Sequence, residues 1–165
     1  MLVNGTPTRT VWWADGVVKM IDQPLLPHRF VIVDMPTHKD TARAIRDMTV
    51  RGAGAIGATG ALGVAQAAVE APDASFHAYV AEAANFLRST RPTAQNLFAG
   101  IDFVLKAIEP EGENVARARA AETALCREAV PPEVVHPVRE RCRPAEPLQP
   151  AAVTAADYKI GRAHV

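Results

Sequence analysis

The residues best suited to chemistry begin at Arg51, which is followed by a glycine-rich run from Gly52 to Gly54. A guanidinium beside the free backbone N–H groups at the start of a helix forms an anion site, most naturally for a phosphate. The alternative is that Arg51 is a solvated charge at the end of the preceding helix and that the glycines serve only packing. Residue types alone do not decide between these two interpretations.

The same segment matches the glycine pattern of a dinucleotide-binding loop, because residues 52–57 read GAGAIG. That motif requires a buried strand directly before its first glycine and an acidic residue closing a second strand about 20 residues later. Here the preceding TARAIRDMTV has helical periodicity, and the region from Asp73 to Val80 also reads as a helix. The context argues against a nucleotide cofactor.

A second arginine, Arg91, lies in the run STRPT at residues 89–93, just ahead of a proline and a predicted helix start. Proline near a first turn fixes such a loop and leaves the arginine directed at whatever lies by the helix N-terminus. Two arginines at two helix starts could then converge on one phosphate. The competing interpretation is an exposed loop arginine with no ligand.

Other reactive residue types give weaker signals. Cys126 and Cys142 have neither the spacing of a zinc site nor the number needed for a disulfide framework. Among the five histidines, His28, His38 and His77 are scattered, with no second metal ligand at helical or turn spacing. We therefore predict no metal site, and no general acid and base pair can be assembled from these residues.

The chain has 165 residues, and its 18 basic and 18 acidic side chains give a formal net charge of zero. This balance gives no support to a nucleic-acid surface or a polybasic membrane anchor. The first residues lack the pattern of a signal peptide, and no apolar run approaches a membrane span. We expect a cytoplasmic protein with neither nucleic acid nor membrane as partner.

The first elements that must position these residues are strands. Residues 10–13 and 17–21 are rich in strand formers and flank a turn, which predicts a hairpin. Residues 30–33, bounded by prolines, offer a third strand. A small antiparallel sheet is therefore predicted at the start of the chain.

Helical patterns follow the sheet. Thr37, with Asp40 three residues later, resembles a capping box and predicts a helix over residues 38–48. An alanine-rich helix is predicted next over residues 55–70. Three glycines lie on one face of this helix, at Gly57, Gly60 and Gly63. Because glycine weakens a helix, their presence predicts that another backbone packs very close to this face.

Two further helices are predicted, one capped by Asp73 and ending near Thr90, and one over residues 93–108 with a strong apolar stripe. Residues 113–129 carry a thinner pattern for a fifth helix. The predicted fold class is therefore α+β, with a small N-terminal antiparallel β-sheet followed by a helical bundle.

The composition changes beyond residue 130, since six prolines fall between residues 131 and 150. The final KIGRAHV resembles the in-frame translation of a sequencing-library adapter, which makes residues 131–165 an expected frameshift or adapter artefact. The alternative is a genuine proline-rich disordered tail. We therefore divide the chain into an N-terminal domain at residues 1–130 and an irregular proline-rich tail.

Three segments carry a resemblance to a known family. AIRDMTVRGAGAIGATGALGVAQAA strongly resembles the hallmark IRDMVVRGAPAIG segment of the methylthioribose-1-phosphate isomerases. GTPTRTVWWADGVVKMIDQPLLP resembles the N-terminal segment of that family, and STRPTAQNLFAGID resembles its RPTAVNL segment. The order and spacing agree, over roughly residues 6–129.

The resemblance implies an enzyme with a small N-terminal domain and a Rossmann-like second domain, of which this chain holds only the first. The implied reaction converts 5-methylthioribose 1-phosphate to 5-methylthioribulose 1-phosphate in methionine salvage, without a cofactor. Because the anomeric oxygen carries phosphate, the enzyme must assist ring opening before hydrogen moves from C2 to C1. The resemblance also implies a homodimer for the full-length family.

Carried over by residue, the resemblance implies that Arg51, Gly52, Ala53 and Arg91 bind substrate. Gly54 departs from the family, which usually has proline there. Glycine gives the unfolded chain more conformational entropy than proline does, so this change lowers the stability of the folded turn by ~0.4 to 1 kcal/mol. The catalytic cysteine and aspartate of the family belong to segments with no counterpart here. We therefore expect no catalytic residue in this fragment and no activity from it alone.

Other members of the superfamily define the alternatives. Ribose-1,5-bisphosphate isomerases act on a related sugar phosphate, and the noncatalytic regulatory subunits of a translation-initiation factor do not act as enzymes. The arginine with its glycine turn, together with the WWADGVVKMIDQ opening, favours the methylthioribose enzyme over both.

Overall fold

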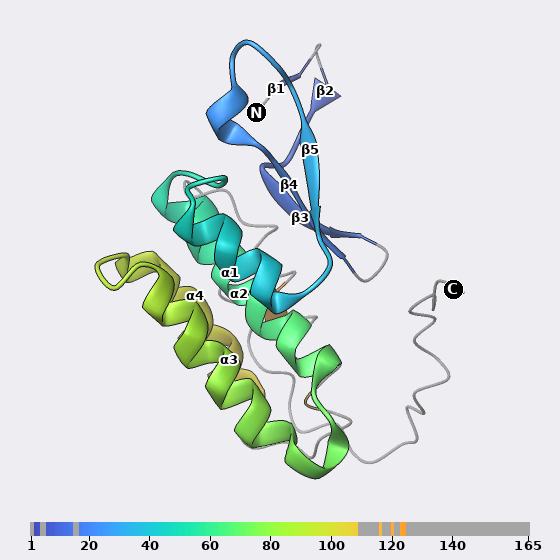
Figure 1. The fold of residues 1–165 in the computed structure, drawn as a ribbon, viewed down its shortest axis with the longest axis vertical. Helices are drawn as coiled ribbons and strands as arrows, with labels where there is room; N and C mark the ends of the chain where they lie inside the picture. Colours follow the sequence, from blue (N-terminus) through green and yellow to red (C-terminus); the bar gives the residue numbers. More distant parts are fainter. Residues whose placement is uncertain are drawn as a thin grey trace, which may run out of the picture.

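A computed structural model describes residues 2–3, 6–14 and 17–108, together with Ala116, Ala120, Thr123 and Ala124. Within these ranges a small sheet lies at one end of a bundle of helices, as Figure 1 shows. This arrangement is the predicted α+β class. Cys126, Cys142 and the predicted tail at residues 131–165 lie outside the described residues.

The main sheet has three antiparallel strands, β3 (Val11–Ala14), β4 (Val17–Ile21) and β5 (Ile32–Met35), in the order β3-β4-β5. A separate pair joins β1 (Leu2–Val3) to β2 (Thr6–Pro7). The predicted hairpin is confirmed, because β3 and β4 pair along their whole length.

The third strand was predicted two residues too early, at 30–33. Ile32 pairs with Ile21, the last residue of β4, so Phe30 has no partner residue in that strand. The chain instead turns through a 3-10 helix, η1 (Gln23–Leu25), and the Asp22 N–H donates to Val31 O at 2.9 Å before pairing begins. The turn geometry, which apolar patterning does not report, sets where β5 starts.

Helix α1 (His38–Arg46) begins at the predicted capping box. The Asp40 N–H donates to Thr37 Oγ1 at 3.3 Å, and the Thr37 hydroxyl donates to Asp40 Oδ2 at 2.7 Å. The helix ends two residues before the predicted Met48, because the chain turns at that residue into a left-handed conformation with φ of 62°. Its buried side packs on the next helix.

Helix α2 (Ala53–Glu70) is the central element, and all residues from Ile56 to Ala68 are buried. The close backbone approach predicted from its glycines is confirmed where it crosses α4 (Gln95–Ile108). A Cβ added at Gly100 would lie 2.1 Å from Gly57 O, and one added at Gly60 would lie 2.5 Å from Leu97 Cδ1. These positions therefore leave no room for a side chain larger than that of glycine.

The sheet is tied to the bundle through a buried polar side chain on α2. Gln66 is 2 % exposed, its amide donates to Met35 O at 2.7 Å, and its carbonyl accepts from the Thr41 hydroxyl at 2.5 Å. One amide thus joins β5, α1 and α2. Because a buried amide is costly when unpaired, this junction fixes the three elements in one arrangement.

Helix α3 (Phe76–Thr90) begins after a short 3-10 turn, η2 (Asp73–Ser75). The prediction of Asp73 as its cap is wrong: the N-cap is Ser75, because the Ser75 N–H donates to Pro72 O in the tighter turn and delays the α-helix. Helix α4 begins two residues later than predicted, after a turn at residues 92–93.

The predicted fifth helix, at residues 113–129, is only partly described. Its described positions are helical, and the three alanines among them are fully buried against the bundle, at Ala116, Ala120 and Ala124. Small side chains at this spacing allow an element to pack closely.

Candidate functional site

The candidate site is built on the loop that joins α1 to α2. Its backbone is held by hydrogen bonds from the Met48 N–H to Ile45 O at 3.3 Å and from the Thr49 N–H to Ala44 O at 3.0 Å. Val50 is fully buried and anchors the loop to the core. The following residues, 51–54, are exposed. A fixed loop therefore presents the predicted residues at the surface.

Gly52 forms the N-cap of α2 with φ of 90°, a conformation that side-chain-bearing residues rarely adopt. No side chain caps this end of the helix. The first turn of an α-helix leaves backbone N–H groups without intrahelical acceptors and carries the positive end of the helix dipole. The exposed start of α2 at Ala53 is thus suited to an anion.

Arg51 is exposed but is not randomly placed. Its backbone N–H donates to Gln23 Oε1, and its Nε donates to Met48 O at 3.3 Å. Gln23 is itself fixed to the same loop, since its N–H donates to Thr49 O at 3.0 Å. The Arg51 side chain is therefore folded back onto Met48, in the loop between α1 and α2.

Arg91 reaches the same loop from another helix. It is the half-buried C-cap residue of α3, and its Nη1 contacts Met48 Sδ. The sequence interpretation put this arginine at a helix start, but α4 begins four residues later, at Gln95. Arg51 and Arg91, 40 positions apart in the chain, both contact Met48 and so lie on one side of the bundle.

Sequence reasoning missed Met48 and Gln23, the two residues that hold the arginines. Met48 stands inside the hallmark segment, three residues before Arg51, and its place there was the available signal. Gln23 lies 28 positions from Arg51, and nothing in its local pattern links the two. The four residues are brought together only by the packing of the sheet and α3 around α1.

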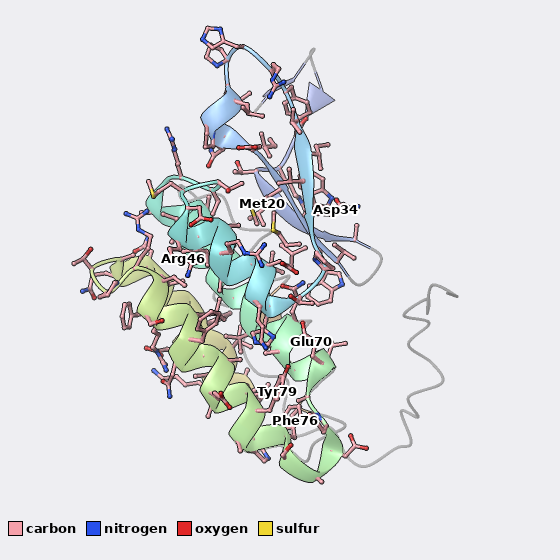
Figure 2. The ribbon with its side chains drawn as sticks, viewed as in Figure 1. Met20, Asp34, Arg46, Glu70, Phe76 and Tyr79 are labelled. Atoms are coloured by element: carbon pink, nitrogen blue, oxygen red, sulfur yellow. The ribbon has the colours of Figure 1, made fainter. Side chains whose placement is uncertain are left out.

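A second polar cluster lies at the opposite end of α2, where Figure 2 labels Glu70 and Tyr79. The Glu70 carboxylate accepts from the His38 N–H at 2.8 Å and lies 2.5 Å from His38 Nδ1, and the Tyr79 hydroxyl donates to it at 3.3 Å. Partial burial raises the pKa of Tyr79 above its usual value, and the charges of Glu70 and Glu82 add to this.

The chemistry that the arginines and the start of α2 offer is anion binding. Guanidinium groups present several N–H donors in a planar fork that matches a phosphate. Among the residues that the structure describes, no three His, Cys, Asp or Glu side chains gather at one point as a metal ion would require. In the same ranges, every helix is too short or too polar to span a bilayer.

Comparison with known proteins identifies the class. Residues 49–143 match the Initiation factor 2 subunit family, and the chain belongs to this family. The matched range includes both arginines and the start of α2.

Within the class, the chain is similar to named isomerases. It is 46% identical over 135 residues to the methylthioribose-1-phosphate isomerase of Paramagnetospirillum magneticum, covering 78% of this chain and 36% of that protein. It is 43% identical over 133 residues to the enzyme of the same name from Cereibacter sphaeroides, covering 79% and 35%. The chain spans about a third of the length of these relatives.

Two solved structures share the fold. The 5-methylthioribose 1-phosphate isomerase of Pyrococcus horikoshii superposes with a TM-score of 0.69 at 33% identity, covering 72% of this chain and 35% of that one. The translation initiation factor eIF-2B subunit delta of A. fulgidus gives 0.68 at 38% identity, covering 74% and 37%. The fold is therefore shared by proteins named as an enzyme and as a translation factor subunit.

Proposed function

We propose that Arg51, Gly52, Ala53 and Arg91 form a phosphate cradle, and that this cradle serves an aldose-ketose isomerase acting on 5-methylthioribose 1-phosphate. The observation that carries the proposal is the shared contact of both arginines with Met48, beside the uncapped start of α2. Similarity to proteins named methylthioribose-1-phosphate isomerase supports the choice of substrate.

The proposed role of the cradle follows from the substrate. Its phosphate sits on the anomeric oxygen, next to the two carbons between which hydrogen must move. Charge-assisted hydrogen bonds from two guanidinium groups and the dipole of an 18-residue helix favour a doubly charged phosphate at this point. A fixed phosphate holds C1 and C2 in one position while acid and base groups act on them.

The acid and base groups themselves are proposed to lie elsewhere in the isomerase. The family resemblance assigns catalysis to a cysteine and an aspartate in segments without a counterpart in this chain. We therefore expect the 165-residue chain to bind the sugar phosphate without turning it over. Formation of 5-methylthioribulose 1-phosphate by the purified chain would contradict this expectation.

The test is a titration of the purified chain with 5-methylthioribose 1-phosphate, followed by NMR of the backbone and arginine side-chain N–H signals. We expect Arg51→Ala or Arg91→Ala to weaken binding by at least about tenfold, because each removes charged hydrogen bonds to phosphate. The matched control is Arg46→Ala, which removes an exposed arginine paired with Asp47 from the same end of α1. Equal affinities for Arg51→Ala and the unmodified chain would refute the cradle.

A second candidate function is that of a noncatalytic regulatory subunit, which the similarity to the A. fulgidus eIF-2B subunit delta favours. In that role, the chain would bind a partner protein instead of a sugar phosphate. Failure of the unmodified chain to bind 5-methylthioribose 1-phosphate at millimolar concentration would favour it. A parallel titration with ribose 1,5-bisphosphate distinguishes the related isomerase, because the tighter ligand identifies the sugar.

A further inference from the structure

Met48 has an unusual backbone. Within the described ranges it is the one non-glycine residue with positive φ, at 62°. A methionine is not a usual occupant of this left-handed conformation, which glycine and asparagine adopt more readily. This conformation ends α1: the Met48 N–H donates to Ile45 O and the Thr49 N–H donates to Ala44 O, the two hydrogen bonds of a Schellman helix end with its left-handed residue at Met48.

At this helix end, Met48 also contacts both arginines. Its carbonyl oxygen accepts from Arg51 Nε at 3.3 Å, and its sulfur contacts Arg91 Nη1. The left-handed turn places the carbonyl and the side chain of a single residue in contact with guanidinium groups from two different segments. Because each guanidinium has five N–H donors, a contact through one of them leaves most of the fork available to a ligand.

We propose that Met48 is a positioning residue that holds Arg51 and Arg91 together against one phosphate; this inference rests on the proposed function. The thioether is a weak, polarizable acceptor, so it orients the Arg91 guanidinium without neutralising it as a carboxylate would. Met48 therefore preorganises two like charges that would otherwise repel. Phosphate binding then does not require the ordering of two long, flexible side chains, so less conformational entropy is lost on binding.

The experiment separates positioning from folding by two substitutions. Met48→Gly relieves the left-handed backbone and removes the side chain, so we expect unchanged or higher thermal stability together with about fivefold weaker binding of inorganic phosphate. Met48→Leu keeps the apolar volume and removes the sulfur, and we expect an intermediate loss of affinity. Met35→Leu is the matched control, since Met35 is a half-buried methionine in β5 away from the cradle, and it should bind as the unmodified chain does.

The readouts are the dissociation constant for inorganic phosphate and the chemical shifts of the two arginine Nε–H groups, with the unfolding temperature of each variant. Phosphate affinity unchanged in both Met48 variants, while Arg51→Ala loses binding, overturns this inference and leaves the cradle intact. Loss of affinity only in proportion to loss of stability also overturns it. No binding by the unmodified chain, or binding unaffected by Arg51→Ala, overturns the proposed function and this inference together.

Discussion

The two ends of α2 use their polar groups in opposite ways. At the C-terminal end, the Glu70 carboxylate accepts a hydrogen bond from the first N–H of α1 and pairs with the imidazole of His38. It also accepts a hydrogen bond from the Tyr79 hydroxyl. At the N-terminal end, no side chain caps the helix, and residues 51–54 are exposed. One end is satisfied within the protein, whereas the other offers its donors to solvent or a ligand.

This contrast explains how a small bundle can hold a site without losing its fold. The closed end joins α1, α2 and α3 through one carboxylate, so stability is supplied at a distance from the open end. Eighteen residues of α-helix separate the two ends by about 27 Å. Figure 2 shows this separation, with Arg46 toward one end of the bundle and Glu70 and Tyr79 toward the other.

The largest expected effect comes from disrupting the packing of α4 on α2, the helix that joins the two ends. In Gly100→Ala the new Cβ would lie 2.1 Å from Gly57 O, a backbone atom that cannot move without shifting α2 against α4. We expect a loss of about 3 kcal/mol or more in the free energy of unfolding, measured by urea denaturation. The exposed neighbour Ala99 is the control, because Ala99→Ser should change stability by no more than about 0.5 kcal/mol. A Gly100→Ala protein of normal stability would mean that the helices do not cross in backbone contact.

The second-largest effect tests whether the C-terminal end of α2 stabilises the fold without affecting the site at its N-terminal end. Glu70→Ala leaves the buried His38 ring and its backbone N–H without their acceptor, so we expect a loss of about 2 kcal/mol in unfolding free energy. Phosphate affinity at the other end should not change. The control is Glu82→Ala, an exposed carboxylate on α3 near Tyr79. Weaker phosphate binding in Glu70→Ala at unchanged stability would show that the two ends are coupled.

The smallest expected effect concerns the exposed first turn of α2, where a side chain has room that it lacks deeper in the helix. A Cβ at Gly54 would meet no atom within 4 Å, so Gly54→Ala should raise the unfolding free energy by about 0.4–1 kcal/mol by restricting the unfolded chain. Gly60→Ala, in the same helix, should instead destabilise the protein, since its Cβ would lie 2.5 Å from Leu97 Cδ1. Thermal unfolding of the pair gives the two signs. A loss of stability in Gly54→Ala would mean that the exposed turn needs its glycine.

Much of the fold could be predicted because its determinants are local. Thr37 and Asp40 cap α1 from adjacent turns, and the apolar stripe of α4 repeats at helical spacing, so a short window of sequence contains the whole signal. The start of β5 and the N-cap of α3 were misplaced for the opposite reason. Each is set by a 3-10 turn whose hydrogen bonds compete with the regular element next to it.

The candidate site divides in the same manner. The arginine that precedes a glycine turn and a long apolar helix could be found from the sequence, because neighbouring residues in the chain are neighbours in that turn. The sequence also predicted, through its glycines, that two helices must touch. In contrast, tertiary packing places Arg91 beside the same methionine as Arg51, and it brings Gln23 to accept a hydrogen bond from the loop. Such contacts join segments tens of residues apart, and they exist only once burial of the shared core has brought those segments together.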